Sequence, residues 1–204
     1  MDIFSYIVRY DSGFAPNPYH GVCTLACCKP KIRAAASARD GGDWVMGTAP
    51  SPLERHLIYL MKVSRTLTFD LYWQQYPEKR NSPANPRGDN IYEPIGGSPS
   101  GFRQLENPAH DSRHRARDLS ENRVLISDHF FYFGKNAPLL SPEYANLVHN
   151  TQGHKRIRAR CDNRFALFDN LLAWVEKNWK PGIHGEPSDE ELICMPEEEP
   201  DIEE

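Results

Sequence analysis

Hydrophobic and polar positions divide the chain into short apolar runs, one long polar region and one helical pattern. Runs rich in β-branched and aromatic residues predict strands over residues 3–10, 43–48, 56–63, 123–127 and 129–134. Apolar residues spaced for one helix face predict a helix over 163–179. The face comprises Phe165, Phe168, Leu171, Leu172, Val175 and Trp179.

Shorter segments are less regular. Residues 21–28 predict a short helical turn that ends before Pro30, and the alanine-rich segment 31–39 predicts a helix. Residues 66–76 favour a short helix with Thr68 as its N-cap. Residues 77–122 are rich in Pro, Gly, Asn and Ser, and predict a loop-dominated insertion.

Separated strands with few helices, without visible βαβ alternation, predict an α+β fold. We expect a small curved mixed sheet or a partly open barrel, with peripheral helices and the long loop insertion. A single domain should span residues 1–182, and residues 183–204 should form an acidic, flexible C-terminal tail. No GxGxxG or GxxxxGK[ST] motif occurs, which disfavours a doubly wound nucleotide-binding fold.

The net charge of −4 hides a strong asymmetry. Ten of the 28 acidic residues lie in 186–204, which contain no Lys or Arg, so residues 1–185 hold 24 basic and 18 acidic residues. A basic body favours a polyanionic partner such as nucleic acid, although a solvated surface with a solubilising tail is the alternative.

Export and membrane signals are not found in the sequence. No run of 18 apolar residues occurs, and the N-terminus lacks the pattern of a signal peptide. The five cysteines are odd in number, so they cannot all be paired in disulfide bonds within one chain. We therefore expect reduced thiols, a cytoplasmic protein and no membrane partner.

The densest chemistry lies in residues 20–33, where three thiols, one imidazole and three cations are close in sequence. Basic neighbours favour a thiolate, so Cys23 or Cys28 could be a nucleophile. The cations Lys29, Lys31 and Arg33 could instead hold a phosphate. Alternatively, Cys23 and Cys27 are small buried residues on one helix face. The segment has no CxxC pair, so we expect no metal and no cofactor.

The polar region offers further candidates. Asp89 and Asn90 could orient a water or read a base edge, or form a solvated turn. His110 and His114 could transfer protons near neutral pH, or belong to a polar loop. Nearby cations could contact phosphates: Arg113, Arg115 and Arg117.

A second basic segment precedes the predicted long helix. Arg156, Arg158 and Arg160 alternate, so they would line one side of an extended segment and could form a phosphate-binding stripe. Aromatic residues at 72–73 and 130–133 could stack bases, but they lie in apolar runs that favour a place in the core.

Four segments, 13–33, 42–48, 88–92 and 123–134, resemble in the same order the nucleotide modification associated domain family of the second type. The resemblance covers residues 1–160. It implies DNA or a modified nucleotide as the partner, with other proteins of a modification system. Cys23 and Cys28 match the thiols of the signature, and Cys27 occupies a variable position. Residues 42–45 also resemble the entry strand of PUA-like barrels.

The resemblance implies an enzyme of the hydrolase or hydratase type as one hypothesis. It would hydrate the nitrile of 7-cyano-7-deazaguanine in DNA to an amide, with Cys23 or Cys28 as nucleophile and Asp89, His110 or His114 as proton carriers. Base or backbone contacts would come from Lys29, Lys31, Arg33, Asn90, Tyr92, Arg113, Arg115, Arg156, Arg158 and Arg160.

Two alternatives remain open. A non-catalytic, PUA-like module would bind a modified base or nucleotide, and is favoured if aromatic residues line a cleft away from any thiol. An interaction subunit of a defence or modification cluster is favoured if no concave basic site exists. The catalytic hypothesis requires a thiol and the Asp89–Asn90 pair to share one cavity.

Overall fold

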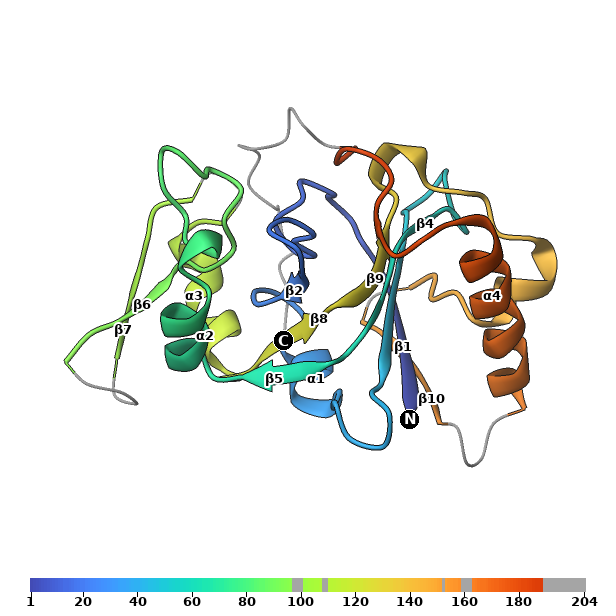
Figure 1. The fold of residues 1–204 in the computed structure, drawn as a ribbon, viewed down its shortest axis with the longest axis horizontal. Coiled ribbons are helices and arrows are strands. Elements are labelled where there is room, and N and C mark those ends of the chain that lie inside the picture. Colours follow the sequence, from blue (N-terminus) through green and yellow to red (C-terminus); the bar gives the residue numbers. More distant parts are fainter. Residues whose placement is uncertain (97–100, 108–109, 152, 159–162, 189–204) are drawn as a thin grey trace, which may run out of the picture.

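The computed structural model describes residues 1–96, 101–107, 110–151, 153–158 and 163–188. Its centre is a six-stranded mixed sheet in the order β10-β1-β3-β4-β9-β11 (Figure 1). The pairs β1–β3 and β9–β11 are parallel and the others antiparallel. The strands are β1 (Asp2–Ile7), β3 (Trp44–Thr48), β4 (Leu57–Lys62), β9 (His129–Tyr132), β10 (Lys155–Arg158) and β11 (Gly182–Ile183).

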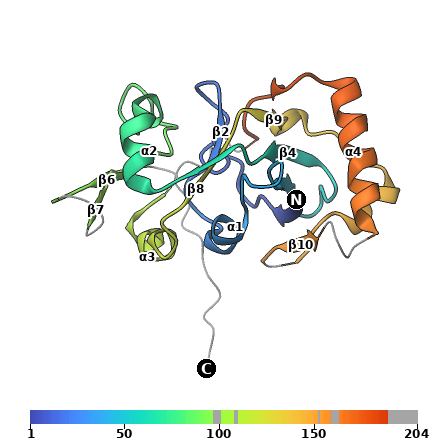
Figure 2. The same cartoon turned by 60° about the horizontal axis from the view of Figure 1, so that its bottom comes forward.

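Two smaller sheets lie beyond one face of the central sheet, and Figure 2 shows them on the side away from α4. The first has the order β2 (Cys23–Leu25), β8 (Val124–Ser127), β5 (Arg65–Leu67), and the second pairs β6 (Tyr92–Pro94) with β7 (Phe102–Gln104). The helices in the described residues are α1 (Pro30–Ala35), α2 (Phe69–Gln75), α3 (Arg115–Leu119) and α4 (Arg164–Asn178). Short 3-10 turns cover Pro77–Lys79, Ser112–His114, Gly134–Asn136 and Pro142–Asn146. The predicted α+β class with a small, open mixed sheet is confirmed.

One face of the central sheet packs against α4, as the helical pattern predicted. Phe168, Leu171 and Val175 of α4 are fully buried against side chains such as Trp44 and Ile157 from the sheet. Because strand side chains alternate between faces, the neighbours of these sheet residues point to the opposite side.

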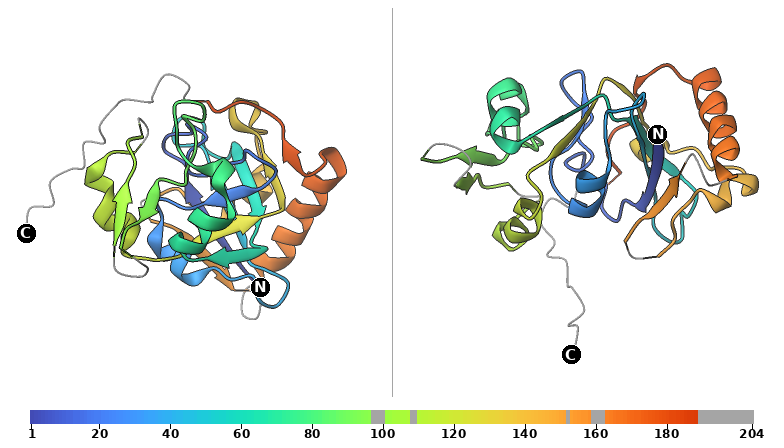
Figure 3. Two further views of the ribbon diagram at one scale, coloured as in Figure 1. Left: turned by 60° about the vertical axis from the view of Figure 1, so that its left-hand side comes forward. Right: turned by 90° about the horizontal axis from the view of Figure 1, so that it is seen from below.

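The opposite face of the sheet forms a second core, in which Phe4 and Tyr6 of β1 lie with Ile32 of α1 and Leu125 of β8. In the view from below in Figure 3, α1 lies between α3 and β1. A third core holds residues from α2, β6 and β8. The second face of the sheet therefore carries the elements that surround the candidate site.

The strand β2 corrects one sequence prediction. The predicted helical turn over residues 21–28 is wrong, because Cys23 and Thr24 pair with Ser127 and Ile126 of β8. Pairing with a strand about 100 residues away overrides local preference here. The helix predicted over 66–76 is confirmed for residues 69–75 as α2, while residues 66 and 67 belong to β5. The Thr68 side chain accepts a hydrogen bond from Leu71 N at 3.4 Å, as predicted for an N-cap.

The polar region 77–122 contains more structure than a loop insertion, since β6, β7 and α3 lie in it. At the other end, the described part of the predicted tail packs on the body. β11 pairs with β9, and Ser188 donates hydrogen bonds to Asp11 from its main-chain N (3.2 Å) and its Oγ (3.3 Å). The packed body thus continues past residue 182 to Ser188. Within the described residues, no helix has the length and apolar character needed to cross a membrane.

Candidate functional site

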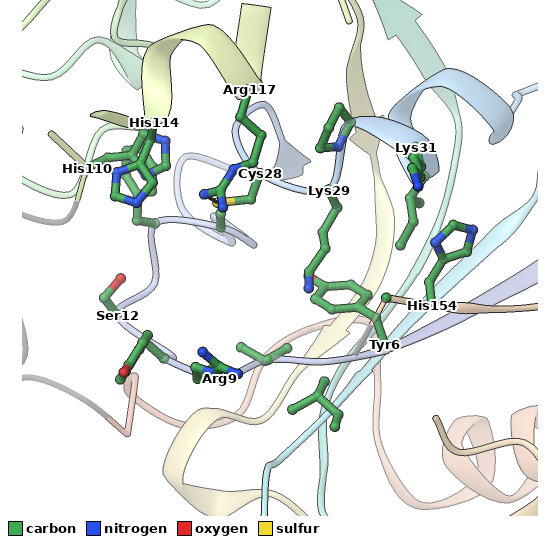
Figure 4. A pocket seen from close by; sticks show the side chains of 18 residues that line it. Tyr6, Arg9, Ser12, Cys28, Lys29, Lys31, His110, His114, Arg117 and His154 are labelled. Carbon is green, nitrogen blue, oxygen red and sulfur yellow. Dashed lines mark hydrogen bonds between the residues drawn. The ribbon is translucent and has the colours of Figure 1, made fainter. Parts of the chain in front are cut away.

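A cavity of about 500 Å³ opens on the face of the sheet opposite α4 (Figure 4). Its volume lies in the range of small-molecule sites. Segments far apart in sequence supply the polar lining: Tyr6 of β1, Cys28 and Lys29 ahead of α1, His110, His114 and Arg117 around α3, and His154 ahead of β10.

The backbone at Cys28 is unusual and held from two sides. Cys28 and Lys29 have φ values of 62° and 41°, in the left-handed region that costs a non-glycine residue about 1–3 kcal/mol. The Asp118 carboxylate accepts a hydrogen bond from Cys28 N at 2.8 Å, and the Arg33 guanidinium donates to Cys28 O at 2.9 Å. These contacts fix the turn that leads from β2 into α1 and direct the thiol to the cavity.

Cys28 differs from the other two cysteines in the described residues. It is partly exposed and lines the cavity, whereas Cys23 and Cys27 are fully buried. Burial raises the pKa of Cys23 to about 12 and raises that of Cys27 well above its usual value. Arg117 Nη2 lies 3.9 Å from Cys28 Sγ, where a guanidinium stabilises a thiolate. Cys28 is therefore the sulfur that a molecule in the cavity can reach.

The two predicted histidines lie together on the cavity wall. Their rings stack at 4.3 Å between centroids, and Phe14 stacks on His110 at 5.1 Å. His110 Nε2 lies 2.5 Å from Asp118 Oδ2, which anchors this ring. His114 is the more exposed of the two, and its Nδ1 lies 3.3 Å from Asp111 Oδ1.

Asp118 connects the thiol to the histidines, although the sequence did not single it out. Its carboxylate interacts with Cys28 N, His110 Nε2 and the Tyr92 hydroxyl, the last at 3.0 Å. Burial alone would favour the neutral acid, but these hydrogen bonds and the charge of His110 lower the pKa of Asp118. Tyr92 and Asp118 are buried, and through these contacts they hold His110 and the Cys28 main chain in place at the cavity.

Asp89 and Asn90 lie outside the cavity lining. Asp89 is fully buried and accepts hydrogen bonds of 2.6 Å from Thr24 Oγ1 and the Tyr72 hydroxyl. Burial raises the pKa of Asp89 despite the nearby Lys79. Asn90 Nδ2 donates to the carbonyls of Tyr72 and Tyr76, both at 3.1 Å. The fold brings this motif to the thiol segment, but as support beneath it rather than as a wall of the same cavity. The expected cavity shared by a thiol and the Asp89–Asn90 pair is therefore not found, and among the predicted proton carriers His110 and His114 are the ones that line the cavity with Cys28.

Lys79 completes this buried network, and no sequence signal marked it, because lysine is rarely fully buried. Its ammonium donates to Asn17 Oδ1 (2.8 Å), Val22 O (2.8 Å) and Thr24 Oγ1 (3.1 Å). Burial lowers the pKa of Lys79, and the Asp89 carboxylate counteracts this effect. We call Lys79, Thr24, Asp89 and Tyr72 the buried network.

The predicted binding cations separate into two groups. Lys29 and Lys31 line the cavity, and Lys29 Nζ lies 4.7 Å from the centre of the Tyr6 ring. Arg33 is fully buried, and its guanidinium donates four hydrogen bonds to main-chain carbonyls. Its partners are Cys28, Asp118, Glu121 and Arg123. Arg33 is thus placed to fasten the Cys28 segment to the α3 region rather than to contact a phosphate.

Arg113, Arg115, Arg156 and Arg158 lie outside the lining of the cavity. Arg113 is exposed and forms an ion pair with Asp111 at 2.6 Å, and Arg115 donates to Phe102 O at 2.9 Å. On β10, Arg156 forms an ion pair with Asp2 at 2.6 Å, and Arg158 is exposed. Arg160 lies outside the described residues.

One buried group has the donor types of a metal site. The ligand atoms of Cys27, His110 and Asp118 lie within 4.8 Å of one another. A structural zinc site has four protein ligands and a catalytic one three with a water, and the described residues supply three here, all of them buried. The carboxylate of Asp118 also already interacts with three donors. We therefore describe this group as a hydrogen-bonded support of the cavity wall.

Comparison with known proteins gives one match, to the model of nucleotide modification associated domain 2, over residues 1–193. The chain belongs to this family. No curated protein and no solved structure matches it. Membership of the nucleotide modification associated domain 2 family confirms the resemblance and indicates a role in DNA or nucleotide modification. A nucleic acid or nucleotide is accordingly the substrate class, and all cavity residues lie in the matched region.

The different accessibility of Cys23, Cys27 and Cys28 makes a direct prediction. Iodoacetamide near neutral pH should modify Cys28 more than about tenfold faster than Cys23 or Cys27, because the latter are buried and protonated. Peptide mapping by mass spectrometry over time measures this. In Arg117→Ala, the labelling of Cys28 should slow. Equal labelling of Cys23 and Cys28 in the folded protein would contradict the assignment.

Proposed function

We propose that this chain modifies a base of DNA or of a nucleotide through the Cys28 thiol. The reaction proposed is hydration of the nitrile of 7-cyano-7-deazaguanine to the amide. The observation that carries the proposal is the position of Cys28 in a cavity beside Arg117, His110 and His114. Family membership supplies the nucleotide context.

The proposed steps need only water as a second reactant. The Cys28 thiolate adds to the nitrile carbon, and the nitrogen takes a proton to give a thioimidate. Water then adds to the same carbon, and one of its protons passes to the nitrogen through a base. The carbon–sulfur bond breaks, the electron pair returns to sulfur, the oxygen gives its remaining proton to the base, and the amide remains. One nitrile and one water give one amide, and the thiolate is regenerated.

Each polar side chain of the wall has a role suited to its contacts. Arg117 stabilises the thiolate before attack and after departure. His114, the more exposed imidazole, carries the proton to nitrogen and takes one from water. His110 is a positioning residue, because Asp118 holds its Nε2 and its ring stacks on His114.

The aromatic lining favours catalysis over simple binding. A non-catalytic module is expected to hold a base on aromatic side chains away from any thiol. Here Tyr6, Tyr10 and Phe14 line the same cavity as Cys28. A base stacked on these rings would therefore lie in the same cavity as the Cys28 thiol.

The test incubates the protein with oligonucleotides that contain 7-cyano-7-deazaguanine, single-stranded and double-stranded, and analyses the digested nucleosides by mass spectrometry. Gain of one water on the modified nucleoside is expected. A base inside a duplex must be flipped out, so the single strand should react faster. Absence of the amide from both forms would exclude this reaction, and tight binding without conversion would favour the recognition module.

A further inference from the structure

The cavity has two chemically different ends. Figure 4 shows His110 and His114 at one end and Lys31 and His154 at the other, with Tyr6 and Lys29 between them. The first end includes the thiol and the imidazole pair. The second end is cationic, and nothing in the proposed reaction uses it.

β10 contributes to the cationic end from the edge of the sheet. The Arg156 guanidinium carbon lies 5.3 Å from the centre of the Phe4 ring, and the His154 ring lies 6.1 Å from it. Ile157 packs into the core on the α4 side. Because strand side chains alternate, His154, Arg156 and Arg158 point toward the cavity face.

Positive charge dominates the surroundings of His154. Partial burial lowers its pKa most, followed by the charges of His149, Lys31, Lys29 and Arg156. In the described residues the Asp2 carboxylate pairs with Arg156, and Lys29, Lys31 and His154 line the same cavity. A cavity end that gathers several cationic side chains is suited to an anion.

We infer that the cationic end, formed by Lys29, Lys31 and His154, binds the phosphate of the nucleotide whose base lies against Cys28. The inference rests on the proposed function and specifies its substrate as a phosphate-bearing deoxynucleotide, rather than a free base or nucleoside. A phosphate offers charged oxygens to ammonium and imidazolium donors, which form short, strong hydrogen bonds with them. The phosphate can belong to a free nucleotide or to a DNA strand, and the two sources are distinguished below.

Phosphate binding has a pH signature at His154. A bound phosphate stabilises the imidazolium and raises the lowered pKa of His154, so binding takes up a proton. The affinity for the phosphate should therefore increase as the pH is lowered between the pKa of His154 in the complex and its pKa in the free protein. The affinity should decrease as the pH is raised through the same range. A phosphodiester isolates this effect, because a phosphate monoester itself titrates near pH 6.

The experiment measures dissociation constants for deoxyguanosine, deoxyguanosine 5′-monophosphate and a short single-stranded guanine-containing oligonucleotide. These probes carry no nitrile, so binding is separated from turnover. At least one phosphate-bearing probe should bind about tenfold or more tightly than the nucleoside. A preference for the monophosphate indicates a free nucleotide as substrate, and a preference for the oligonucleotide indicates a DNA strand.

Lys31→Ala and His154→Ala should remove this preference, and His154→Ala should also remove the pH dependence of oligonucleotide affinity. Lys177→Ala is the control, because Lys177 lies on α4, on the other face of the sheet. Equal affinity for the nucleoside and the phosphate-bearing probes would overturn the inference. It would also be overturned if Lys177→Ala lowered the preference for phosphate as much as Lys31→Ala and His154→Ala do. Conversion of the nitrile by Cys28 could still be observed in that case, so failure here is distinguishable from failure of the proposed function.

Discussion

Cys28→Ser is expected to lower the rate of nitrile conversion by roughly 10³-fold or more, because the hydroxyl lacks the nucleophilicity of a thiolate beside Arg117. The rate is measured as amide formed per unit time from the single-stranded oligonucleotide. Nucleotide affinity should change little, since serine preserves the volume and the main-chain hydrogen bonds at this position.

The buried thiols provide the controls for that experiment. Cys27→Ala should retain most of the activity, because Cys27 lies in the core with its thiol directed to Asp89 O at 3.7 Å. Its stability will fall, so rates are compared at a temperature where both variants are folded. Full activity in Cys28→Ser would refute the assignment of the nucleophile. So would a loss of activity in Cys27→Ala that is not seen in Cys28→Ser.

Lys79→Met should produce the largest loss of stability. Removing the ammonium leaves the buried acceptors of Asn17, Val22 and Thr24 without their donor, and it removes the nearby positive charge that offsets the burial of Asp89. The loss of a buried charge from such a hydrogen-bonded network costs about 3–5 kcal/mol. For a chain of this size the melting temperature should fall by about 6–20 °C, at 2–4 °C per kcal/mol. Calorimetry or circular dichroism on heating measures the change.

The double variant Lys79→Met with Asp89→Asn tests the coupling within the buried network. It should be more stable than the sum of the two single losses predicts, since neither charge is then left alone. Strictly additive losses would show that the two groups do not interact.

Strong local patterns predicted much of the fold. The apolar face of α4 was evident because its side chains repeat with the period of a helix. β3 and β4 were evident as continuous apolar runs, since both strands are buried along nearly their whole length. β2 was wrongly predicted because its structure depends on β8, a partner remote in sequence, and not on its own composition.

The candidate site was predicted in part for a similar reason. Residue type identified Cys28, His110 and His114, which the fold brings to one cavity. Residue type does not reveal burial, so Asp89 and Arg33 have the chemistry of a site but lie inside the protein. Asp118 and Lys79 gave no signal, because their importance comes from partners that only the folded chain supplies.

The contacts of Arg33 have a consequence for how this cavity comes to exist during folding. Its guanidinium joins the carbonyl of Cys28 to that of Arg123, and Arg33 and Arg123 are 90 positions apart in the chain. Contacts of such separation form only after a large loop has closed, which is the slow part of assembling a mixed fold. The segment that carries Cys28 is thus anchored late, and a nascent chain that ends before residue 123 would lack one of the hydrogen bonds that hold it.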